Sequence, residues 1–479
     1  MKKSHLSLPV VYVALFLSLA TGAVFLLPWI NPESNRNLEL SLPGQDDAPF
    51  ADNKIELEVN IEGQFETFDG QASDLPGTWP RFRGPESDNI CRNGASLMDK
   101  WPEDGPKVIW SIKLGEGHAA AAVLNGRIYL LDYDEERRGD ALRCLSLNDG
   151  REIWRRFYKV PAKRNHGLSR TIPAVTAKWV VTLGPRCQVM CVNSVTGEFR
   201  WGIDLLSEYG TTEPLWFAGQ CPLIDGETAI LAPAGTDTLM MGVDCGTGEV
   251  LWQTANVNGW KMSHSSIIPM TIFGKKMYVY CAIGGILGVS ADGKGEMLWK
   301  LPWNKPVVAP SPVQLSDNRI FITAGYGGGG RMIQVEKTAS GFEAKTIADN
   351  SPKEWLASEQ QTPIYHEGLL YGIMPKDSGA LRQQFVCYDP DSKKLVWASG
   401  KSARFGLGPF LLADNKFFIL SDDGVLTMIP VSREKYTELA RHKILDGHDA
   451  WGPIAIAGTR MLMRDSKRMV CIDVGKDAT

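Results

Sequence analysis

The sequence predicts an all-β protein: an eight-bladed β-propeller of four-stranded blades, closed by pairing an N-terminal strand with the last blade. Three observations lead to this fold class. A hairpin-like phrase recurs along the chain, a second apolar run recurs with it at intervals of 43 to 51 residues, and a proline precedes most of these runs. Recurrence at such an interval is typical of propellers and solenoids, in which neighbouring units complete each other's core.

The recurring phrase is an alternating apolar run, a tight turn built on Asp and Gly, and a second run that closes on Trp. This pattern predicts a β-hairpin, because side chains alternate across a strand and the turn requires positive φ. A hairpin alone is only marginally stable in water, so each copy needs neighbours. The clearest copies span residues 144–154, 191–201, 243–252, 289–299 and 387–397.

The second apolar run predicts another strand in every repeat. Its eight copies begin at Arg127, Lys178, Thr228, Lys276, Arg319, Leu369, Lys416 and Arg460. Five to seven residues earlier, seven of the eight repeats carry a proline: Pro173, Pro222, Pro269, Pro312, Pro363, Pro409 and Pro453. Proline has no N–H for a ladder and belongs at the first residue of a strand, so it marks one more strand. Each repeat then holds four strands, the content of one propeller blade.

The two ends of the repeat array predict how the ring closes. Trp110, within residues 107–113, belongs to a closing strand with no partner strands before it, and the last repeat stops after its third strand, at 470–474. We therefore expect the strand at 107–113 to complete the eighth blade, which removes the exposed sheet edges. The fifth and seventh hairpins lack the Trp, near Ile347 and Ile444, and are predicted to be degenerate. Seven blades are the alternative if the fifth repeat is an insertion.

The N-terminal residues predict a membrane anchor. Lys2 and Lys3 precede an uncharged apolar run over residues 6–30, long enough for the ~20 residues that cross the hydrocarbon core. Residues 1–30 are expected to be a signal anchor and transmembrane helix, with the rest on the extracytoplasmic (periplasmic) side. A signal peptide cleaved after Ala20 or Ala23 is the open alternative. Residues 31–78 are predicted to be an acidic flexible linker, and residues 79–479 the propeller.

Composition excludes several functional classes. The net charge of −4 gives no reason to expect nucleic acid or an anionic membrane surface as a partner. Seven His and nine Cys are too few and too scattered to predict a metal cluster. The glycine run at 325–331 precedes a strand instead of a helix, so it predicts a flexible turn and not a phosphate cradle.

The cysteines are predicted to be mainly buried side chains. Four of them occupy apolar positions of the third strand of a repeat: Cys144, Cys191, Cys387 and Cys471. A bridge between Cys187 and Cys191 stays open for an exported chain, because disulfides persist in oxidising compartments.

Together with the hairpins, residues 79–85 (Trp-Pro-Arg-Phe-Arg-Gly-Pro) and 101–106 (Trp-Pro-Glu-Asp-Gly-Pro) resemble the quinoprotein-type (PQQ-like) propeller repeat family, in an exported bacterial branch. The resemblance covers residues 79–474 and implies the propeller fold. Its members include enzymes that carry pyrroloquinoline quinone with Ca²⁺, and non-catalytic scaffolds such as the lipoprotein of the outer-membrane protein assembly machinery. One fold can host both, so fold alone does not fix the function.

The sequence departs from both kinds of relative. No two cysteines are adjacent, whereas the enzymes resemble one another in such a pair, and no clear Glu, Asn and Asp set for Ca²⁺ stands out. No Cys closes the apolar N-terminal run, as lipid attachment would require; Cys91 is the first in the chain.

The connections that lead into each next blade should ring one mouth of the central channel. They carry aromatic and basic side chains, which concentrate binding energy at interfaces. The candidate binding residues are His166, Arg170, Trp216, Trp260, His264, Trp303, Trp355, Arg404 and Trp451. The competing interpretation is that these Trp rings wedge between blades. No catalytic, cofactor-binding or metal-binding residue is expected, because no pair has the spacing of a nucleophile with its base.

The predicted function is a membrane-tethered extracytoplasmic scaffold that is not an enzyme. We expect a monomer that binds a protein or peptide at the mouth or by strand addition, without a cofactor. The alternative is a PQQ-dependent dehydrogenase of alcohols or sugars, with PQQ and Ca²⁺ in the channel. Recognition of a polysaccharide or another small ligand is a third interpretation.

Overall fold

The structure, a computed structural model, describes residues 58–163, 166–316 and 318–476. The chain divides after residue 55, and all described residues belong to the second unit, Glu56–Thr479. The anchor expected over residues 1–30 lies outside the described residues, as do residues 31–57 of the expected linker. In the described part of the chain, no helix has both the length and the apolar character needed to cross a membrane.

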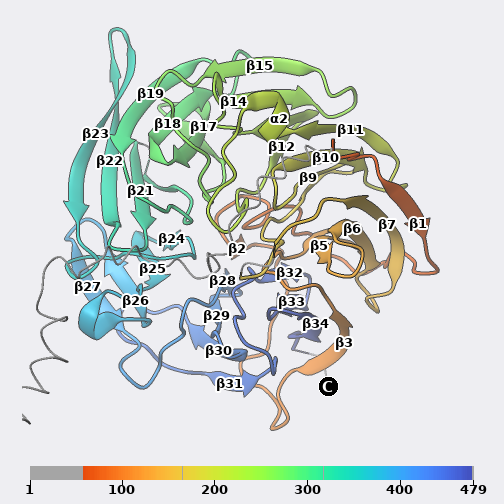
Figure 1. Cartoon of the computed structure of the whole chain (residues 1–479). Coiled ribbons are helices and arrows are strands. Elements are labelled where there is room, and N and C mark those ends of the chain that lie inside the picture. Colours follow the sequence, from red (N-terminus) through yellow and green to blue (C-terminus); the bar gives the residue numbers. More distant parts are fainter. Residues whose placement is uncertain (1–57, 164–165, 317, 477–479) are drawn as a thin grey trace, which may run out of the picture. The chain divides into compact units, whose positions relative to one another are not determined.

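Eight antiparallel blades form the second unit, as the sequence predicted (Figure 1). The first contains β4 (Ala122–Leu124), β5 (Arg127–Asp134), β6 (Gly139–Ser146) and β7 (Glu152–Lys159); the second β8 (Ala174–Val175), β9 (Trp179–Leu183), β10 (Gln188–Asn193) and β11 (Phe199–Asp204). The third contains β12 (Leu223–Asp225), β13 (Thr228–Leu231), β14 (Thr238–Asp244) and β15 (Val250–Ala255); the fourth β16 (Ile268–Ile272), β17 (Lys275–Ala282), β18 (Gly284–Ser290) and β19 (Met297–Trp303).

The remaining four blades follow the same order. The fifth contains β20 (Val313–Ser316), β21 (Arg319–Ala324), β22 (Gly329–Thr338) and β23 (Gly341–Asn350); the sixth β24 (Ile364–His366), β25 (Leu369–Ile373), β26 (Phe385–Asp389) and β27 (Lys394–Ala398). The seventh contains β28 (Phe410–Ala413), β29 (Lys416–Leu420), β30 (Val425–Pro430) and β31 (Ala440–Lys443); the eighth β32 (Ala455–Ala457), β33 (Arg460–Arg464), β34 (Arg468–Asp473) and β3 (Lys107–Lys113). Two short helices of the described residues, α2 (Leu205–Tyr209) and η2 (Gly379–Leu381), lie between strands.

The strand positions confirm the repeat register. Each of the eight predicted second strands is present within one residue of its predicted start. The seven prolines lie at or just before the innermost strand of their blades, where the missing N–H leaves no gap in a ladder.

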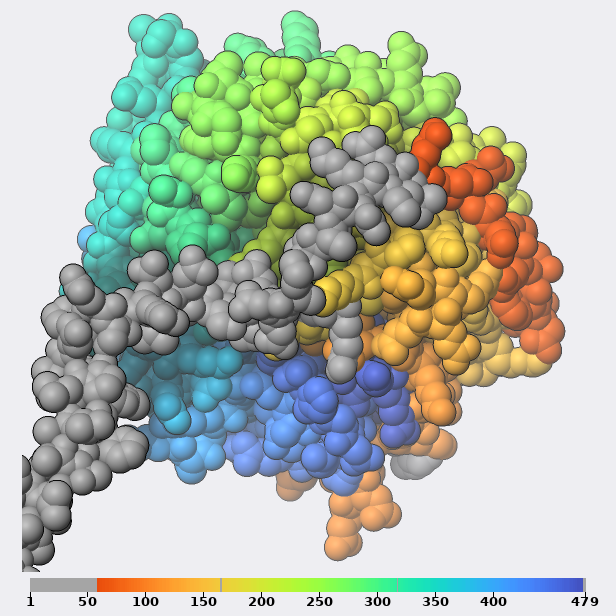
Figure 2. All heavy atoms as spheres, in the orientation of Figure 1, coloured from red at the N-terminus to blue at the C-terminus, as the bar shows by residue number. Residues whose placement is uncertain are grey.

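The predicted closure of the ring is confirmed. β3 pairs antiparallel with β34, and Trp110 lies opposite Cys471. In Figure 2 the orange atoms of the early chain and the dark blue atoms of its end lie side by side. The Trp110 side chain is 8% exposed, and its indole N–H donates to the Leu147 carbonyl of the first blade at 3.1 Å. One tryptophan therefore joins the last blade to the first.

The fifth blade is complete, so the seven-blade alternative is wrong. Its outer hairpin lacks the Trp, yet β22 and β23 have ten residues each and pair from Gly330–Asn350 to Thr338–Gly341. Figure 1 shows this hairpin reaching beyond the neighbouring blades. The backbone ladder and the buried side chains of Met332 and Ile333, one on each face of the sheet, maintain the pairing without the aromatic ring. The seventh hairpin is shorter, with four residues in β31.

Residues 79–98, which include the family-like motif, cross the inner ends of the blades. The backbone of Trp79 pairs with Val123 of the first blade, and the carbonyl of Pro80 accepts from Val175 of the second at 2.8 Å. The buried Arg83 donates to the carbonyls of Thr362 and Pro363 in the sixth blade at 2.8 and 3.1 Å, respectively. This segment therefore ties together blades that are far apart in the sequence.

The same segment continues to the last two blades. β2 (Ile90–Cys91) pairs in parallel with β28 of the seventh blade, and Met98 donates to the carbonyl of Val474 at 2.9 Å. Before it, β1 (Gln64–Thr67) adds a fifth strand to the outer edge of the first blade by pairing with β7. Part of the segment expected to be a linker is thus a strand of the first blade.

A relay of hydrogen bonds joins the inner ends of five successive blades. Each backbone N–H donates to a side chain of the next blade: Ile172 to Cys221 Sγ (3.2 Å), Cys221 to Ser266 Oγ (2.9 Å), Ser266 to Ser311 Oγ (2.9 Å) and Ser311 to Thr362 Oγ1 (2.8 Å). All of these residues are buried. Because buried N–H groups are costly when unpaired, this relay fixes the blades at the channel.

Replacing Trp110 tests the closure. We expect Trp110→Ala to lower the free energy of unfolding by about 3–5 kcal/mol, because it leaves a cavity and an unpaired carbonyl at the junction of the last and first blades. Chemical denaturation followed by circular dichroism measures the change. The control is Val108→Ala on the same strand, where the side chain is 48% exposed and the expected change stays within about 0.5 kcal/mol. Equal losses in both variants would contradict the role of Trp110.

Candidate functional site at the mouth of the propeller

The connections between blades bring an aromatic cluster together at the mouth, defined here as the end of the ring where these connections lie. The Trp216 ring stacks on Tyr326 at 5.7 Å and on His264 at 6.4 Å between ring centroids. Trp216 precedes the third blade, His264 precedes the fourth, and Tyr326 lies in the turn between β21 and β22 of the fifth blade. The stack therefore joins elements that are not sequence neighbours.

Arg170 fixes the backbone of this cluster. Its Nε donates to the Trp216 carbonyl at 2.6 Å, and Nη2 donates to the carbonyls of His166 and Gly167 at 2.8 and 3.2 Å. Burial lowers the pKa of Arg170 to about 10, so the guanidinium is charged at neutral pH. His166 itself is exposed at the edge of the mouth. Four predicted residues, His166, Arg170, Trp216 and His264, thus meet in one place.

The backbone of the cluster is held in the left-handed region. φ is 62° at Trp216, 71° at Phe217, 54° at Tyr326 and 50° at His166. A bulky residue with positive φ is a conformational outlier, and such residues concentrate at binding sites and active sites, where the surrounding structure holds them in place. Two consecutive aromatic residues in this region mark residues 216–217 as the most strained part of the mouth.

A second pair of rings lies elsewhere on the mouth. The His118 ring packs against Trp451 in a tilted arrangement, 5.1 Å between ring centroids, and its Nε2 lies 3.0 Å from the His166 carbonyl. The Trp451 indole N–H donates to Asp422 at 2.8 Å, and Gln361 donates to the Trp451 carbonyl at 3.0 Å. The connections before the first, sixth and eighth blades therefore contact one another, together with a turn of the seventh.

Both buried imidazoles of the mouth are neutral at pH 7. Burial, with the nearby charge of Arg170, lowers the pKa of His118 to about 3 and the pKa of His264 to about 4. Neutral rings stack without the cost of burying a charge beside a guanidinium.

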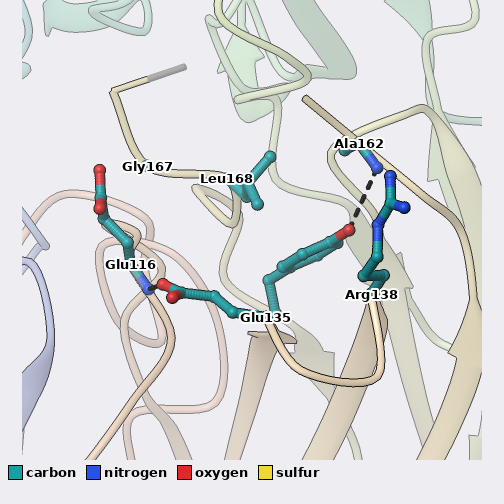
Figure 3. A pocket seen from close by; sticks show the side chains of 7 residues that line it. Glu116, Glu135, Arg138, Ala162, Gly167 and Leu168 are labelled. Atoms are coloured by element: carbon teal, nitrogen blue, oxygen red, sulfur yellow. Dashed lines mark hydrogen bonds between the residues drawn. The ribbon is translucent and has the colours of Figure 1, made fainter. Parts of the chain in front are cut away.

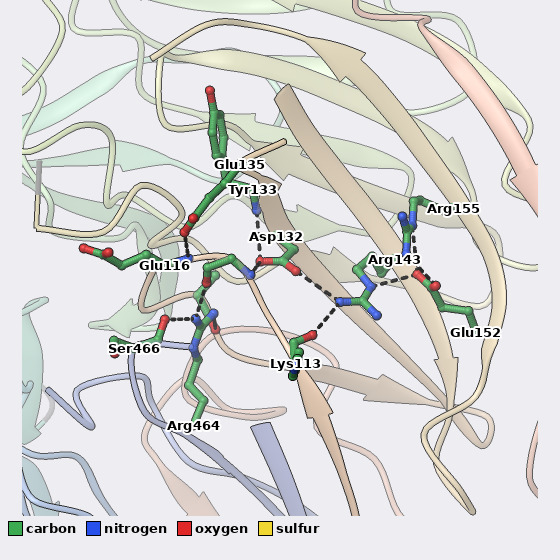
Figure 4. A network of polar contacts seen from close by, with 12 residues as sticks. Lys113, Glu116, Asp132, Tyr133, Glu135, Arg143, Glu152, Arg155, Arg464 and Ser466 are labelled. Carbon is green, nitrogen blue, oxygen red and sulfur yellow. Dashed lines mark hydrogen bonds and ion pairs between the residues drawn. The ribbon is translucent and has the colours of Figure 1, made fainter. Parts of the chain in front are cut away.

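A network of ion pairs holds the connection that carries His118 (Figure 4). The Asp132 carboxylate accepts from the Gly115 N–H at 3.0 Å and pairs with Arg143 at 3.1 Å. From the eighth blade, the fully buried Arg464 donates to the carbonyls of Gly115 and Ala119, each at 3.0 Å. Burial raises the pKa of Asp132, and the two guanidinium groups oppose that shift. Polar groups of the first blade and of the eighth blade thus position the connection that carries His118.

The other predicted residues do not join the aromatic cluster. Trp260, Trp303 and Trp355 are 8%, 2% and 2% exposed. The Trp355 ring meets Phe321 of the fifth blade and Tyr388 of the sixth edge-on, at 5.4 and 5.9 Å. These three rings pack within and between blades, as the competing interpretation describes.

Arg404 is partly buried and pairs through its backbone with Gln384. It contributes no described contact to the stack around Trp216.

Sequence reasoning missed His118, Gln361, Asp422 and Tyr326. A turn was predicted over 325–331; the turn spans 325–328 and β22 begins at Gly329, and Tyr326 of this turn was not recognised as part of the mouth. His118 had a usable signal: once residues 107–113 are accepted as the closing strand, the residues after them must form another connection at the mouth.

In the described residues, neither the cysteines nor the metal-ligating side chains form a further site. All nine cysteines lie there and are free thiols, so no bridge joins Cys187 to Cys191. The four cysteines predicted to be apolar strand positions are buried. Across the described ranges, no three His, Cys, Asp or Glu side chains are grouped closely enough to hold a metal ion.

The depressed pKa of His118 predicts a pH dependence of stability. An unfolded chain protonates its histidines near pH 6.5, whereas folded His118 does so only near pH 3, so the folded state loses stability as the pH falls between these values. His118→Gln removes this loss. Below pH 6, the unfolding free energy of His118→Gln should rise relative to that of the wild type by about 1.4 kcal/mol for each pH unit. Urea denaturation at pH 7, 6 and 5 measures it.

The control for this comparison is His448→Gln, because the His448 side chain is 82% exposed. A constant difference between the wild type and His118→Gln across this pH range would show that His118 titrates as freely in the folded state as in the unfolded chain.

Comparison with known proteins agrees with the fold. The family model described as outer membrane protein assembly factor BamB matches residues 137–399, which is 263 of the 479 residues. BamB from Moraxella catarrhalis is 12% identical, with a TM-score of 0.51 over 77% of this chain and 99% of that one. A europium-containing methanol dehydrogenase is 12% identical, with a TM-score of 0.58 over 83% and 89% of the two chains.

A third solved structure, quinohemoprotein alcohol dehydrogenase ADHIIG from Pseudomonas putida HK5, is 13% identical, with a TM-score of 0.54 over 85% of this chain and 81% of that one. No curated protein sequence matches the chain. At these identities the likeness to solved structures establishes the fold alone. The family match spans more than half of the sequence, and the chain belongs to the BamB-like family of PQQ-type β-propellers.

Proposed function

We propose that this chain is a membrane-tethered, extracytoplasmic propeller that acts as a non-catalytic scaffold, binding a protein or peptide at the mouth. The observation that carries the proposal is the stack of Trp216 on Tyr326 beside Arg170. Tyr326 is 51% exposed, so its ring is available to a partner while the stack holds it in place. Rigid aromatic rings and arginine supply much of the binding energy at protein interfaces.

Two further observations support the proposal. The family is described as an assembly factor for outer-membrane proteins, a task that requires contact with other proteins. The uncharged run over residues 6–30, preceded by two lysines, favours export of everything that follows it. The partner is therefore expected outside the cytoplasm.

The alternative is a quinone-dependent dehydrogenase of alcohols or sugars, which shares this fold. Calcium takes six to eight oxygen ligands, and no three acidic or imidazole side chains of the described chain are grouped for a metal ion. The sequence also lacks adjacent cysteines. These features favour the scaffold.

Removing the exposed ring of the stack tests the scaffold. We expect Tyr326→Ala to reduce recovery of the bound protein by about tenfold or more, because losing an aromatic anchor costs at least ~2 kcal/mol of binding. The measurement is affinity capture with the detergent-solubilised full chain and quantitative mass spectrometry. The matched control is Phe273→Ala, whose ring is 46% exposed in a turn at the opposite end of the strands. Equal recovery with Tyr326→Ala and the wild type would place the binding surface away from the mouth.

Cofactor addition separates the scaffold from the dehydrogenase. We expect the purified chain, incubated with PQQ and Ca²⁺ and then desalted, to retain no quinone absorbance. We also expect it to reduce no artificial electron acceptor when alcohols or sugars are added. The controls are a quinoprotein dehydrogenase treated in the same way and the chain without Ca²⁺. Retained chromophore with turnover would support the dehydrogenase and overturn the non-catalytic proposal.

A further inference from the structure

A carboxyl group is buried at the seam, defined here as the interface between the first and second blades. Asp140, the second residue of β6, has no exposed surface, and its Oδ2 accepts from the Tyr158 hydroxyl of β7 at 2.6 Å. Its other oxygen, Oδ1, is buried and accepts no hydrogen bond from any residue that the structure describes. A buried carboxylate without a full set of donors is costly, and such a group takes up a proton instead.

The second blade closes over this carboxyl. Met190 and Val192 of β10 pack against the first blade in one core cluster, and alternate residues of a strand share a face, so Gln188 of β10 also faces the first blade. Gly184 donates its N–H to the Gln188 carbonyl at 2.7 Å. Gly184 also lies so close to Asp140 that a Cβ at this position would come within 2.2 Å of Oδ2. The seam therefore has no room for a larger residue beside the carboxyl.

The side chain of Gln188 presents a second acceptor without a donor. Its Nε2 donates to Oδ2 of Asp204 at 3.0 Å, and Oδ1 of Asp204 accepts from the Leu206 N–H at the start of α2, also at 3.0 Å. Because the amide nitrogen is used in this way, Oε1 is the oxygen that remains, and no described residue donates to it. Gln188 is 2% exposed. Each side of the seam thus carries one buried oxygen that lacks a donor.

The charged groups around the seam supply no cation to Asp140. Arg186 pairs with Glu213 at 3.0 Å, and Figure 3 shows the exposed Arg138 side chain at a surface pocket of the first blade. Burial raises the pKa of Asp140 to about 7, and the hydrogen bond from Tyr158 opposes this rise. The titratable and charged groups around the carboxyl are Tyr133, Arg138 and Tyr158 of the first blade, and Arg186, Cys187, Asp204 and Glu213 after it in the chain.

We propose that Asp140 is a proton-dependent latch between the first two blades: the neutral acid holds the seam closed, and release of its proton to water loosens the seam as the pH rises past neutrality. In the acid form Oδ2 still accepts from Tyr158, while the O–H on Oδ1 is a donor for Oε1 of Gln188. In the carboxylate form both oxygens of the seam lack a donor. The latch belongs to the frame of the propeller and does not depend on the proposed partner surface.

Asp140→Asn tests the proton, because it keeps the shape of the side chain, is neutral at every pH and offers an N–H in place of the acid O–H. An unfolded chain releases this proton near pH 3.9 and the folded chain only near pH 7, so the wild type loses stability as the pH rises between these values. Relative to Asp140→Asn, its unfolding equilibrium constant should rise about tenfold per pH unit from pH 5 and level off above pH 7.

Urea denaturation of the detergent-solubilised full chain at pH 5, 6, 7 and 8 measures this difference. The matched control is Asp149→Asn, an exposed carboxyl in the turn between β6 and β7, whose difference from the wild type should not change with pH. A constant difference between the wild type and Asp140→Asn over this range would overturn the proposal.

Tyr158→Phe tests the hydrogen bond to the carboxyl. The hydroxyl stabilises the carboxylate form, so its removal should move the levelling-off of the stability profile to a higher pH. The position of this change on the pH axis is independent of any general loss of stability in the variant. An unchanged position would show that Tyr158 does not bond to this carboxyl, and the geometry on which the latch depends would be wrong.

Hydrogen–deuterium exchange tests whether the proton closes the seam. At pH 8 we expect peptides covering residues 139–146 and 188–193 to exchange about tenfold faster in the wild type than in Asp140→Asn, and at the same rate at pH 6. Comparing the two proteins at one pH cancels the intrinsic pH dependence of exchange. The internal control is the peptide covering residues 329–338 of the fifth blade, which should not differ. Equal exchange at the seam at pH 8 would show that Asp140 is no latch.

Discussion

The antiparallel ladder between β3 and β34 is the constraint on which the rest of the propeller depends. The eighth blade has its fourth strand only because β3 pairs with β34, so this ladder completes the ring with residues from opposite ends of the sequence. The chain reinforces the junction from inside, where residues 79–98 bond to the inner strands of several blades. Trp110 and Arg464 then lock the last blade to the first with an indole N–H and a guanidinium.

This closed frame explains how the mouth can hold strained residues. Positive φ at Trp216, Phe217 and Tyr326 is unfavourable, and it persists because Arg170, the ring stack and the Tyr133–Leu168–Phe217 cluster fix these residues from several sides. The same connection, residues 166–170, serves two features. Its carbonyls accept from Arg170 on the side of the stack, while Gly167 and Leu168 line the surface pocket shown in Figure 3.

Much of the fold could be predicted from the sequence because it depends on local patterns. Alternation, turn glycines and strand-initial prolines are each readable within a few residues, and their repetition gave the register of every blade. Closure followed from Trp110, which had no blade of its own. The absence of Trp near Ile347 was a weaker guide to the number of blades, because backbone pairing of β22 with β23 does not need the ring.

The site was harder to predict because it depends on contacts between distant connections. A Trp in a connection gives the same sequence signal whether it wedges between blades, like Trp355, or faces the mouth, like Trp216; only the packing separates them. Tyr326 lies at the mouth because of the conformation of a glycine-rich turn. The alternation of apolar residues in the sequence does not predict that conformation.

The ladder across the termini also governs when this protein can finish folding. β3 leaves the ribosome long before its partner β34, because the two are separated by more than 350 residues of chain. Until then the nascent chain carries an unpaired ribbon and an incomplete eighth sheet, both open to pairing with other chains. Contacts so remote in sequence form slowly, because the loop between them must first be closed. A chain truncated before Arg468 would lose β34, and with it the partner that β3 requires.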